Sequence, residues 1–270
     1  AGHATATIAR NGQLTLRGRL ADGTALSATL KPDPEGAYRL FARPYGKRTD
    51  SALAGPLALL PHPALDLRYH VPRDASRLTW SKAPAAKDKT YPAGFSALAL
   101  PVALDPWLPP AAARRATSTT PAQPAVNLAQ RLGLAPDATT GAAPFGLDFL
   151  PAAGSPVTPA QLDALPAALD LSARGQPLIP KGLAAKPTLA FNASTGAVTG
   201  SFTLTDTVPA PTAKNPDATR NVVRKITLSG TLRQPPATEI DALLGVGHFL
   251  LPDLAKGPTP TSGEFQLLSP

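Results

Sequence analysis

The sequence predicts an all-β fold: two related multi-stranded antiparallel units, each a barrel or a sandwich, joined by a Pro/Ala-rich segment. Short segments in which apolar and polar residues alternate recur along the chain, and this period of two is typical of strands with one buried face. The 33 Pro and 21 Gly among 270 residues gather between these segments, as turns between many short strands require. One alternating pattern also occurs near both ends of the chain, which indicates an internal repeat.

The repeated pattern is GQLTLRGRL at residues 12–20 and GAVTGSFTL at residues 196–204. In each copy every second residue is apolar or Gly, and the residues between them are small or polar. We therefore expect one face of each strand to lie in a core. The side chains predicted to be buried are Leu14, Leu16, Val198 and Phe202.

The first unit is expected over residues 1–104, as strands separated by turn residues. Asn-Gly at 11–12 between alternating segments favours a hairpin that pairs 4–10 with 13–20, since both turn residues tolerate positive φ. Asp-Gly at 22–23 predicts the next tight turn. Further strands are expected at 25–31, 36–43, 53–60, 77–82 and 95–104, with Trp80 and Phe95 as core anchors.

The second unit is expected over residues 186–270 and repeats the first. Its strands are predicted at 188–191, 196–205, 220–233, 245–252 and 263–267. The strand opened by Gly245 corresponds in frame to the one opened by Gly36, and the strand opened by Gly263 to the one around Gly55. Gly at such places allows unusual dihedral angles or a close backbone crossing.

Residues 105–185 are expected to form a connecting region with short strands and one helix. Its first part, 105–125, is rich in Pro, Ala, Ser and Thr, which is typical of an extended linker. Residues 126–134 are predicted to form a strand. Thr158 followed by Pro supplies a helix cap and a first helical residue, so we expect the helix near 159–165.

The net charge of +8 is unevenly distributed. Residues 1–91 hold 14 Lys and Arg against 7 Asp and Glu, whereas residues 92–270 hold 12 against 11. A basic first half suits an anionic partner such as an acidic polysaccharide, or is the solvated exterior of strands. Because the chain lacks RNA-binding runs and a helix-turn-helix pattern, we expect no nucleic acid partner. The residues predicted to contact an anionic partner are Arg17, Arg19, Arg39 and Arg43.

The sequence offers little catalytic chemistry. The absence of Cys excludes disulfides, thiolate metal sites and Cys nucleophiles. Among the four His no metal-ligand spacing occurs, and His248 is expected at the surface. His62 and His70 flank Asp66 in a Pro-rich loop, where a metal or acid–base site is the alternative to a plain loop. With no G-x-S-x-G motif either, we expect no enzyme activity and no cofactor.

Several features suit a location outside the cell. The chain has neither Cys nor Met, the side chains most easily oxidised. No run of 18 apolar residues is present, so no transmembrane segment is predicted. The sequence starts at Ala1 without an initiator Met, which suits the small-residue cleavage site of a signal peptide. We therefore expect a secreted or cell-surface protein.

Motifs over about two-thirds of the chain resemble a Gly-rich tandem β module of large secreted or surface-exposed bacterial proteins of uncharacterised function. The motifs are G-x-V-x-G-x-F-x-L at 196–204, an Arg-to-Gly strand at 224–230, G-x-G-x-F-L-L-P at 245–252 and S-G-x-x-x-L at 262–267. Trp80 and the segment 91–95 are similar to the upstream half of that module. The resemblance implies a structural module and brings no catalytic residues.

These observations favour a non-enzymatic structural protein, a homo-oligomer or filament subunit of a bacterial cell-surface assembly. The alternatives are a surface adhesin that recognises anionic glycan and a hydrolase with an unrecognised site. Free sheet edges and the Pro-rich segment would join copies of the chain. We expect residues 105–125 to be ordered by contact rather than by their own hydrogen bonds, because Pro lacks the N–H group. The predicted assembly contacts are Leu104, Trp107 and Leu108.

Overall fold

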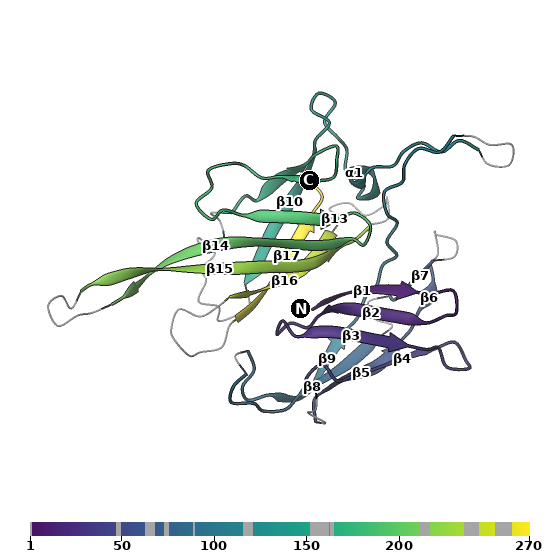
Figure 1. Cartoon of the computed structure of the whole chain (residues 1–270), viewed down its shortest axis with the longest axis horizontal. Coiled ribbons are helices and arrows are strands. Elements are labelled where there is room, and N and C mark those ends of the chain that lie inside the picture. The colour runs from purple at the N-terminus through teal and green to yellow at the C-terminus, as the bar shows by residue number, and fades with distance from the viewer. Residues whose placement is uncertain are drawn as a thin grey trace. The chain divides into compact units, whose positions relative to one another are not determined.

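The computed structural model confirms the predicted all-β class (Figure 1). It describes residues 2–46, 50–62, 68–72, 76–88, 90–115, 121–151, 162, 165–210, 217–234, 243–251 and 261–270. The chain divides into two compact units, residues 2–108 and 109–270. The boundary between the two units falls between Leu108 and Pro109.

The first unit contains two main antiparallel sheets. One has the order β1 (His3–Ile8), β2 (Leu14–Arg19) and β3 (Ala25–Leu30). The other has the order β4 (Tyr38–Ala42), β5 (Ala52–Leu57), β8 (Arg77–Lys82) and β9 (Phe95–Pro101). The short strands β6 (Leu60–Pro61) and β7 (Tyr69–His70) pair with each other. The hairpin predicted at residues 11–12 joins β1 to β2, and Gly12 has the positive φ that its turn requires.

Both sheets of the first unit bury their apolar faces in one core. Leu14 and Leu16 lie in it, as predicted, together with leucines of the other sheet. Trp80 is 1% exposed, and the Phe95 ring meets it edge to face with the ring centroids 4.7 Å apart. The alternating pattern therefore predicted the buried residues correctly, because the side chains on one face of a strand all point into the core and those on the other face do not.

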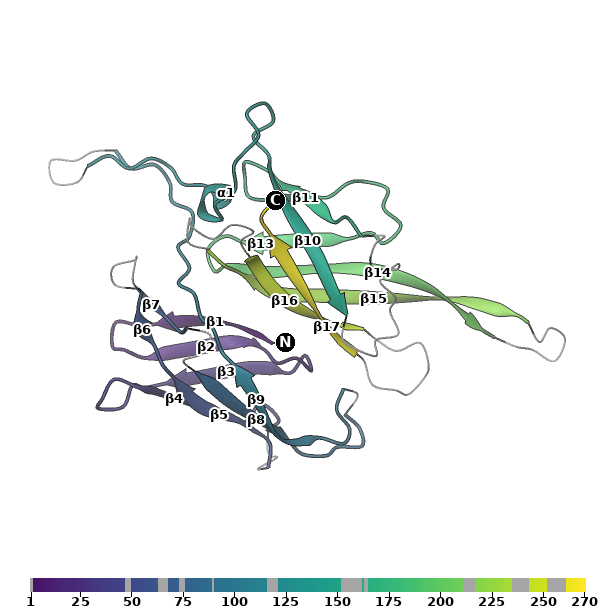
Figure 2. The same ribbon diagram turned by 180° about the vertical axis from the view of Figure 1, so that it is seen from behind.

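The second unit is one eight-stranded antiparallel sheet that curls into a nearly closed barrel (Figure 2). Its strands are β10 (Ala143–Pro151), β11 (Ala168–Leu171), β12 (Pro177–Leu178), β13 (Thr188–Asn192), β14 (Ala197–Pro209), β15 (Thr219–Leu232), β16 (Leu243–Leu251) and β17 (Thr261–Leu268). They lie in the order β12-β11-β10-β17-β16-β15-β14-β13, and the edge strands β12 and β13 approach each other without a ladder. The core is aromatic: Phe149 meets Phe202 at 5.3 Å and Phe249 at 5.8 Å between ring centroids.

The two units share a strand order once the second is read from β13. The strands β1 to β5 correspond to β13 to β17, and the first two pairs and the last pair of this series are antiparallel neighbours in both units. In the first unit β8 and β9 follow in sequence, whereas their counterparts β10 and β11 precede β13. For these seven strands the order in the second unit is thus circularly permuted relative to the first, and β12 has no counterpart. Strands from the expected connecting region complete the sheet of the second unit.

The strand pairing reproduces the predicted frame of the repeat. Gly55 lies opposite Leu40, and Gly263 lies opposite Phe249. Val198 and Phe202 are buried, as expected from the pattern. The units differ at one junction, because β15 and β16 form a ladder whereas β3 and β4 belong to separate sheets.

Residues 126–134 are not a strand, contrary to the prediction. They contain the helix α1 (Leu128–Arg131), with Asn127 as its N-cap. The Asn127 side chain accepts a hydrogen bond from the Gln130 N–H, and the Gln130 side chain accepts one from the Asn127 N–H. This capping box outweighs the strand pattern of the short apolar run. The helix predicted near 159–165 lies almost wholly outside the described residues.

The Pro-rich segment forms hydrogen bonds of its own, which corrects the expectation that it forms none. Residues 109–115 run back along 121–126 as an arm beside α1 (Figures 1 and 2). Ala111 and Val126 exchange two backbone hydrogen bonds of 2.9 and 2.8 Å, and Arg114 and Gln123 exchange two of 2.8 and 3.0 Å. The arm pairs at its non-Pro residues, so the missing Pro N–H groups do not interrupt it.

Candidate functional site

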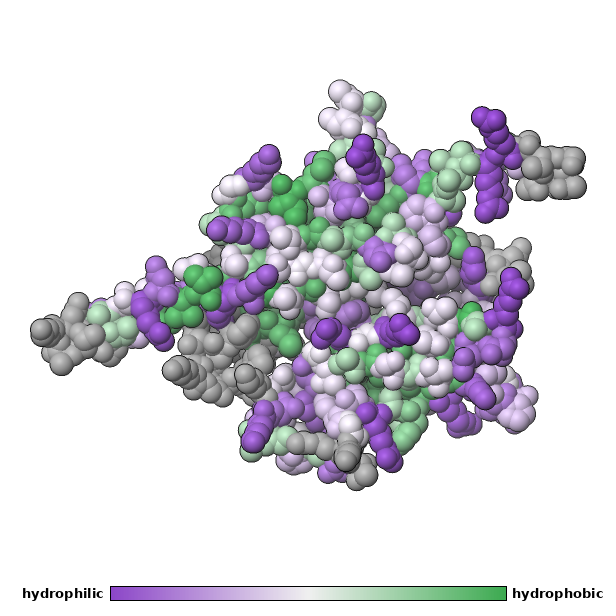
Figure 3. Space-filling view, in the orientation of Figure 1, coloured by the Kyte–Doolittle hydropathy of each residue, from purple (hydrophilic) through white to green (hydrophobic). Residues whose placement is uncertain are grey.

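The four arginines predicted to contact an anionic partner lie on two different sheets. Arg17 and Arg19 are exposed on β2, whereas Arg39 lies on β4 and Arg43 follows it. The Arg39 Nε lies 3.8 Å from Asp33 Oδ2, and the Arg43 guanidinium lies 5.4 Å from the centroid of the Phe41 ring. Figure 3 shows isolated hydrophilic side chains among weakly polar ones over the sheet of β1, β2 and β3. Binding of an anionic polysaccharide stays a prediction.

The three predicted assembly contacts follow β9 directly. Leu104, Trp107 and Leu108 are all half-buried. Leu104 forms an isolated bridge with Val71, with hydrogen bonds of 2.9 and 3.1 Å between their backbones. The start of the Pro-rich segment is therefore held by its own unit.

The strand β9 is an edge that carries no charge. Its sequence is FSALALP, and five of its seven residues are exposed. It pairs with β8 on one side, and no described strand pairs with its other side. Leu98 lies opposite Trp80 and so shares its face, yet Leu98 is 46% exposed while Trp80 is 1% exposed. The apolar face of this sheet thus continues past the part that the unit covers.

The free backbone groups of β9 follow from its hydrogen bonding. The Val102 N–H donates to the Ser76 carbonyl, toward the β8 side. Successive residues of a strand direct their N–H groups to opposite sides. Along the regular part of the ladder, from Leu98 to Pro101, Ala99 therefore directs its N–H and C=O groups toward the free side. Sequence reasoning identified this strand but not its edge position, for which the lack of charge along 95–104 was the available signal.

The second notable site is a buried lysine that the sequence analysis missed. Lys82 is the last residue of β8 and is 3% exposed. Its Nζ lies 2.5 Å from Asp22 Oδ2 and 2.8 Å from Asp88 Oδ2. Asp22 stands in the turn between β2 and β3, and its side chain is 1% exposed. A turn of one sheet and a strand end of the other thus meet inside the first unit.

Aromatic side chains enclose this ammonium group. Its Nζ lies 4.8 Å from the centroid of the Tyr45 ring and 5.3 Å from that of Tyr91. The Tyr45 hydroxyl donates to Asp22 Oδ2 at 2.6 Å and accepts from the Trp80 Nε1–H at 3.1 Å. The rings supply cation–π attraction and exclude water, while the hydrogen bonds fix the carboxylate.

The surroundings of the Lys82 cluster shift the pKa values of its acidic side chains. Burial raises the pKa of Asp22, but hydrogen bonds from Lys82, Tyr45 and Thr24 outweigh it and leave that pKa below its usual value. At Asp88 burial acts in the same direction and is likewise outweighed by Lys82 and by backbone hydrogen bonds, so its pKa is lowered too. Burial, and then the Asp22 carboxylate, raise the pKa of the Tyr45 hydroxyl. The resting cluster is therefore an ammonium between two carboxylates.

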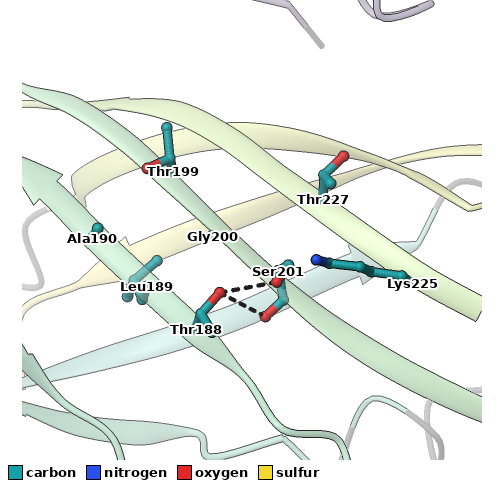
Figure 4. Close-up of a pocket in the computed structure, with 8 residues that line it drawn as sticks. All are labelled: Thr188, Leu189, Ala190, Thr199, Gly200, Ser201, Lys225 and Thr227. Carbon is teal, nitrogen blue, oxygen red and sulfur yellow. Dashed lines mark hydrogen bonds between the residues drawn. The ribbon is translucent and has the colours of Figure 1, made fainter.

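A shallow hollow on the outer face of the barrel offers less chemistry. It lies over β13, β14 and β15 (Figure 4). The Thr188 hydroxyl lies 2.9 Å from the Ser201 hydroxyl and 3.3 Å from the Ser201 carbonyl oxygen, while Lys225 stands at the margin. These hydroxyl groups bond to each other instead of converging on a common point.

The histidines give no metal site in the part of the chain that is described. No group of three His, Cys, Asp or Glu residues there is placed to hold a metal ion. His62 and His70 stack edge to face at 5.3 Å between ring centroids, and Asp66 lies outside the described residues. His248 is 3% exposed, contrary to the prediction. It belongs to an interior strand, where Ser229 and Glu264 flank it in the neighbouring strands.

Among the described residues no helix is both long and apolar enough to span a membrane.

Comparisons with known proteins identify no relative of this chain. No family model matches the chain, and searches of curated proteins and of solved structures return no match.

Proposed function

We propose that the protein is a structural subunit of an extracellular, cell-surface or filamentous assembly, in which copies of the chain join by strand addition at β9. The observation that carries the proposal is the uncharged, largely exposed edge of this strand, with Leu98 46% exposed on the face of the core.

Proteins that remain monomeric protect their sheet edges with charged residues, Pro, bulges or covering segments. Along Phe95–Pro101 the only such features are the terminal Pro101 and a register irregularity opposite Trp80 and Lys82. The stretch from Ser96 to Leu100 carries no charge and is apolar from Ala97 onward. Pairing there satisfies the outward backbone groups of Ala99 and removes Leu98 from water.

The partner is a second copy of the chain, with β9 set antiparallel against its counterpart. Such a contact has two-fold symmetry, and two uncharged strands bring no electrostatic repulsion. A two-fold contact gives a dimer, so growth into a polymer needs another surface. The half-buried group of Leu104, Trp107 and Leu108 supplies that second contact in the proposal.

The proposal is tested with Ala99→Pro, measured by sedimentation velocity and light scattering over a wide range of concentrations. This change removes an outward N–H group and leaves the ladder to β8 intact. Ala99→Ser keeps the N–H group and is the matched control. We expect association of the wild type and of the Ser variant, and its loss in the Pro variant with an unchanged circular dichroism spectrum.

A wild type that stays monomeric at high concentration would rule out the proposal. Association that persists in Ala99→Pro would place the contact elsewhere and refute the role of β9. Trp107→Ala tests the second contact: it should limit growth to dimers, whereas continued growth into polymers would exclude that segment.

A further inference from the structure

We propose that Lys82 and Asp22 join in an intramolecular isopeptide bond, an amide between the Lys82 Nζ and the Asp22 Cγ, with loss of one water molecule. The carrying observation is a buried amine wedged between two carboxylates inside an aromatic enclosure. The inference does not depend on assembly and applies to the single chain.

The reactive groups are already held in contact. The Lys82 Nζ lies 2.5 Å from Asp22 Oδ2, so the Asp22 carboxyl carbon is one bond away from the contact atom. Both side chains are at most 3% exposed, so water does not separate the two groups. Fixing an amine against a carboxyl group in this way replaces a bimolecular encounter and can raise the effective concentration by several orders of magnitude.

The side chains of Lys82, Asp22 and Asp88 supply and accept every proton that the reaction transfers. The Lys82 ammonium transfers one proton to the Asp22 carboxylate, which gives a neutral amine beside a neutral acid. The amine lone pair attacks the Asp22 Cγ, and the Asp88 carboxylate, 2.8 Å from the Nζ, takes a proton from the nitrogen. Asp88 then returns this proton to the departing Asp22 oxygen. One C–N bond forms, one C–O bond breaks, water leaves and Asp88 is again a carboxylate.

The two oxygens of Asp22 have different partners that suit these steps. The Thr24 N–H donates to Oδ1 at 2.9 Å and stabilises the negative charge that develops on the oxygen that stays. Lys82 and the Tyr45 hydroxyl both contact Oδ2, the oxygen that leaves as water. The enclosing Tyr45, Tyr91 and Trp80 side chains exclude bulk water, which disfavours hydrolysis of the amide once it has formed.

The ion pair between Lys82 and Asp22 keeps the reaction slow, because both groups must first become neutral. Since the hydrogen bonds favour the carboxylate form of Asp22, the neutral amine and acid are a minor population of the cluster. The reaction is therefore expected as a maturation step after folding, and it is driven forward by loss of water from the enclosed site. The product ties the β2–β3 turn covalently to the end of β8, and hence one sheet of the first unit to the other.

The test is the intact mass of the purified full chain after complete denaturation. We expect a mass below that of the sequence by one water. Digestion with trypsin should yield a branched product that joins residues 20–39 to residues 78–87, because trypsin cleaves neither the bond from Lys31 to Pro32 nor the bond after the modified Lys82. A folded wild-type chain that keeps its full mass after prolonged incubation would overturn the proposal.

Cyclisation of Asp22 onto the Gly23 nitrogen also loses one water, so the site of the loss must be mapped. A dehydrated linear peptide over residues 20–39, with normal cleavage after Lys82, would refute the amide bond. The native Gly23 N–H donates to the Leu20 carbonyl at 2.9 Å, which holds it away from this competing reaction.

Two variants complete the test. Lys82→Arg keeps a cation but replaces the amine with a guanidinium, which stays protonated and does not attack, so it should show the full mass. Asp88→Asn keeps both reacting groups and removes the proton carrier, and it too should stay unlinked or link far more slowly. Linking of Asp88→Asn at the wild-type rate would exclude Asp88 from the reaction, and loss of water from Lys82→Arg would exclude Lys82 as the nucleophile.

Discussion

The two units each bury an ion pair, but with different cations. In the first unit the Lys82 Nζ lies 2.5 Å from Asp22, and in the second the Arg224 Nε donates to Asp206 Oδ2 at 2.8 Å. Both cationic side chains are 3% exposed. A guanidinium keeps its charge in proteins, whereas an amine can lose a proton and become a nucleophile. The two buried ion pairs therefore differ in chemical reactivity. Of the two, only the pair of Lys82 and Asp22 can form an amide bond.

The environments of the pairs differ as well. Lys82 lies among tyrosines and at the edge of the core that contains Trp80. Arg224 lies on β15, which extends with β14 out of a barrel (Figure 1) whose core contains packed phenylalanine rings. The ion pair of the first unit is thus enclosed by tyrosine rings, while a cluster of phenylalanine rings packs in the core of the second. The predictions below test these two environments separately.

The largest effect is expected from Lys82→Met, which leaves Asp22 and Asp88 with no cation between them. Removing one partner of a buried ion pair costs about 3–5 kcal/mol of unfolding free energy. Calorimetry of the full chain should show a lowered transition for residues 2–108 and an unchanged one for 109–270. An equal shift of both transitions would mean that the units unfold together.

The unfolding free energy of the wild type and that of Lys82→Met should change in opposite directions with pH. In the unlinked wild type the lowered pKa values of Asp22 and Asp88 contribute stability above the usual value of 3.8, and this stability is lost as the pH falls through their folded pKa values. In Lys82→Met, burial is no longer opposed by the ammonium, so the pKa of Asp22 rises. The variant should regain stability as the pH falls toward 4, opposite to the wild type. Lys82→Met combined with Asp22→Asn should lose most of this recovery.

A smaller effect is expected at the matching glycines Gly55 and Gly263. A Cβ on Gly55 would stand 2.7 Å from the Arg77 carbonyl oxygen at a φ of +149°, whereas a Cβ on Gly263 would stand 2.2 Å from the Phe249 ring. Each Gly→Ala change should cost about 1–3 kcal/mol, as overpacking does.

The obstacles differ, and a second change distinguishes them. Phe249→Ala should make Gly263→Ala nearly free of further cost, with a coupling of about 0.5–3 kcal/mol in a double-mutant cycle. Leu40→Ala, at the equivalent position, should not rescue Gly55→Ala, because the obstacle there is backbone. Equal rescue at both sites would contradict the structure of one of these crossings.

The sequence predicted what depends on period and turn chemistry. The hairpin at 11–12 and the buried positions Leu14, Leu16, Val198 and Phe202 follow from local rules. The sequence did not predict that β10 belongs to the barrel of the second unit, because alternation indicates which face of a strand is buried but not which strand pairs with it. Phe145, Leu147 and Phe149 alternate within β10 and are all buried, so a strand there was within reach.

The Lys82 cluster could have been anticipated in part. Leu78, Trp80 and Lys82 share one face of β8, so the pattern places a lysine inward, where an unpaired charge is not tolerated. The identity of its partners could not be read from the sequence. Asp22 is 60 residues away in the sequence. An Asp at this position is already explained by the Asp-Gly turn, so the sequence gives no sign of its contact with Lys82.

The smallest effect concerns α1, an element of the second unit with no counterpart among the described elements of the first. Asn127→Ala removes the acceptor of the Gln130 N–H, a bond of 2.9 Å, and should cost about 1 kcal/mol. Because Leu128 and Leu132 are buried, loss of the cap should reach the barrel and lower the transition of residues 109–270. Asn127→Asp keeps a capping acceptor and serves as the control, with stability close to wild type. If Asn127→Ala speeds amide exchange in α1 without moving that transition, the helix is packed on the unit but contributes nothing to its cooperative unfolding.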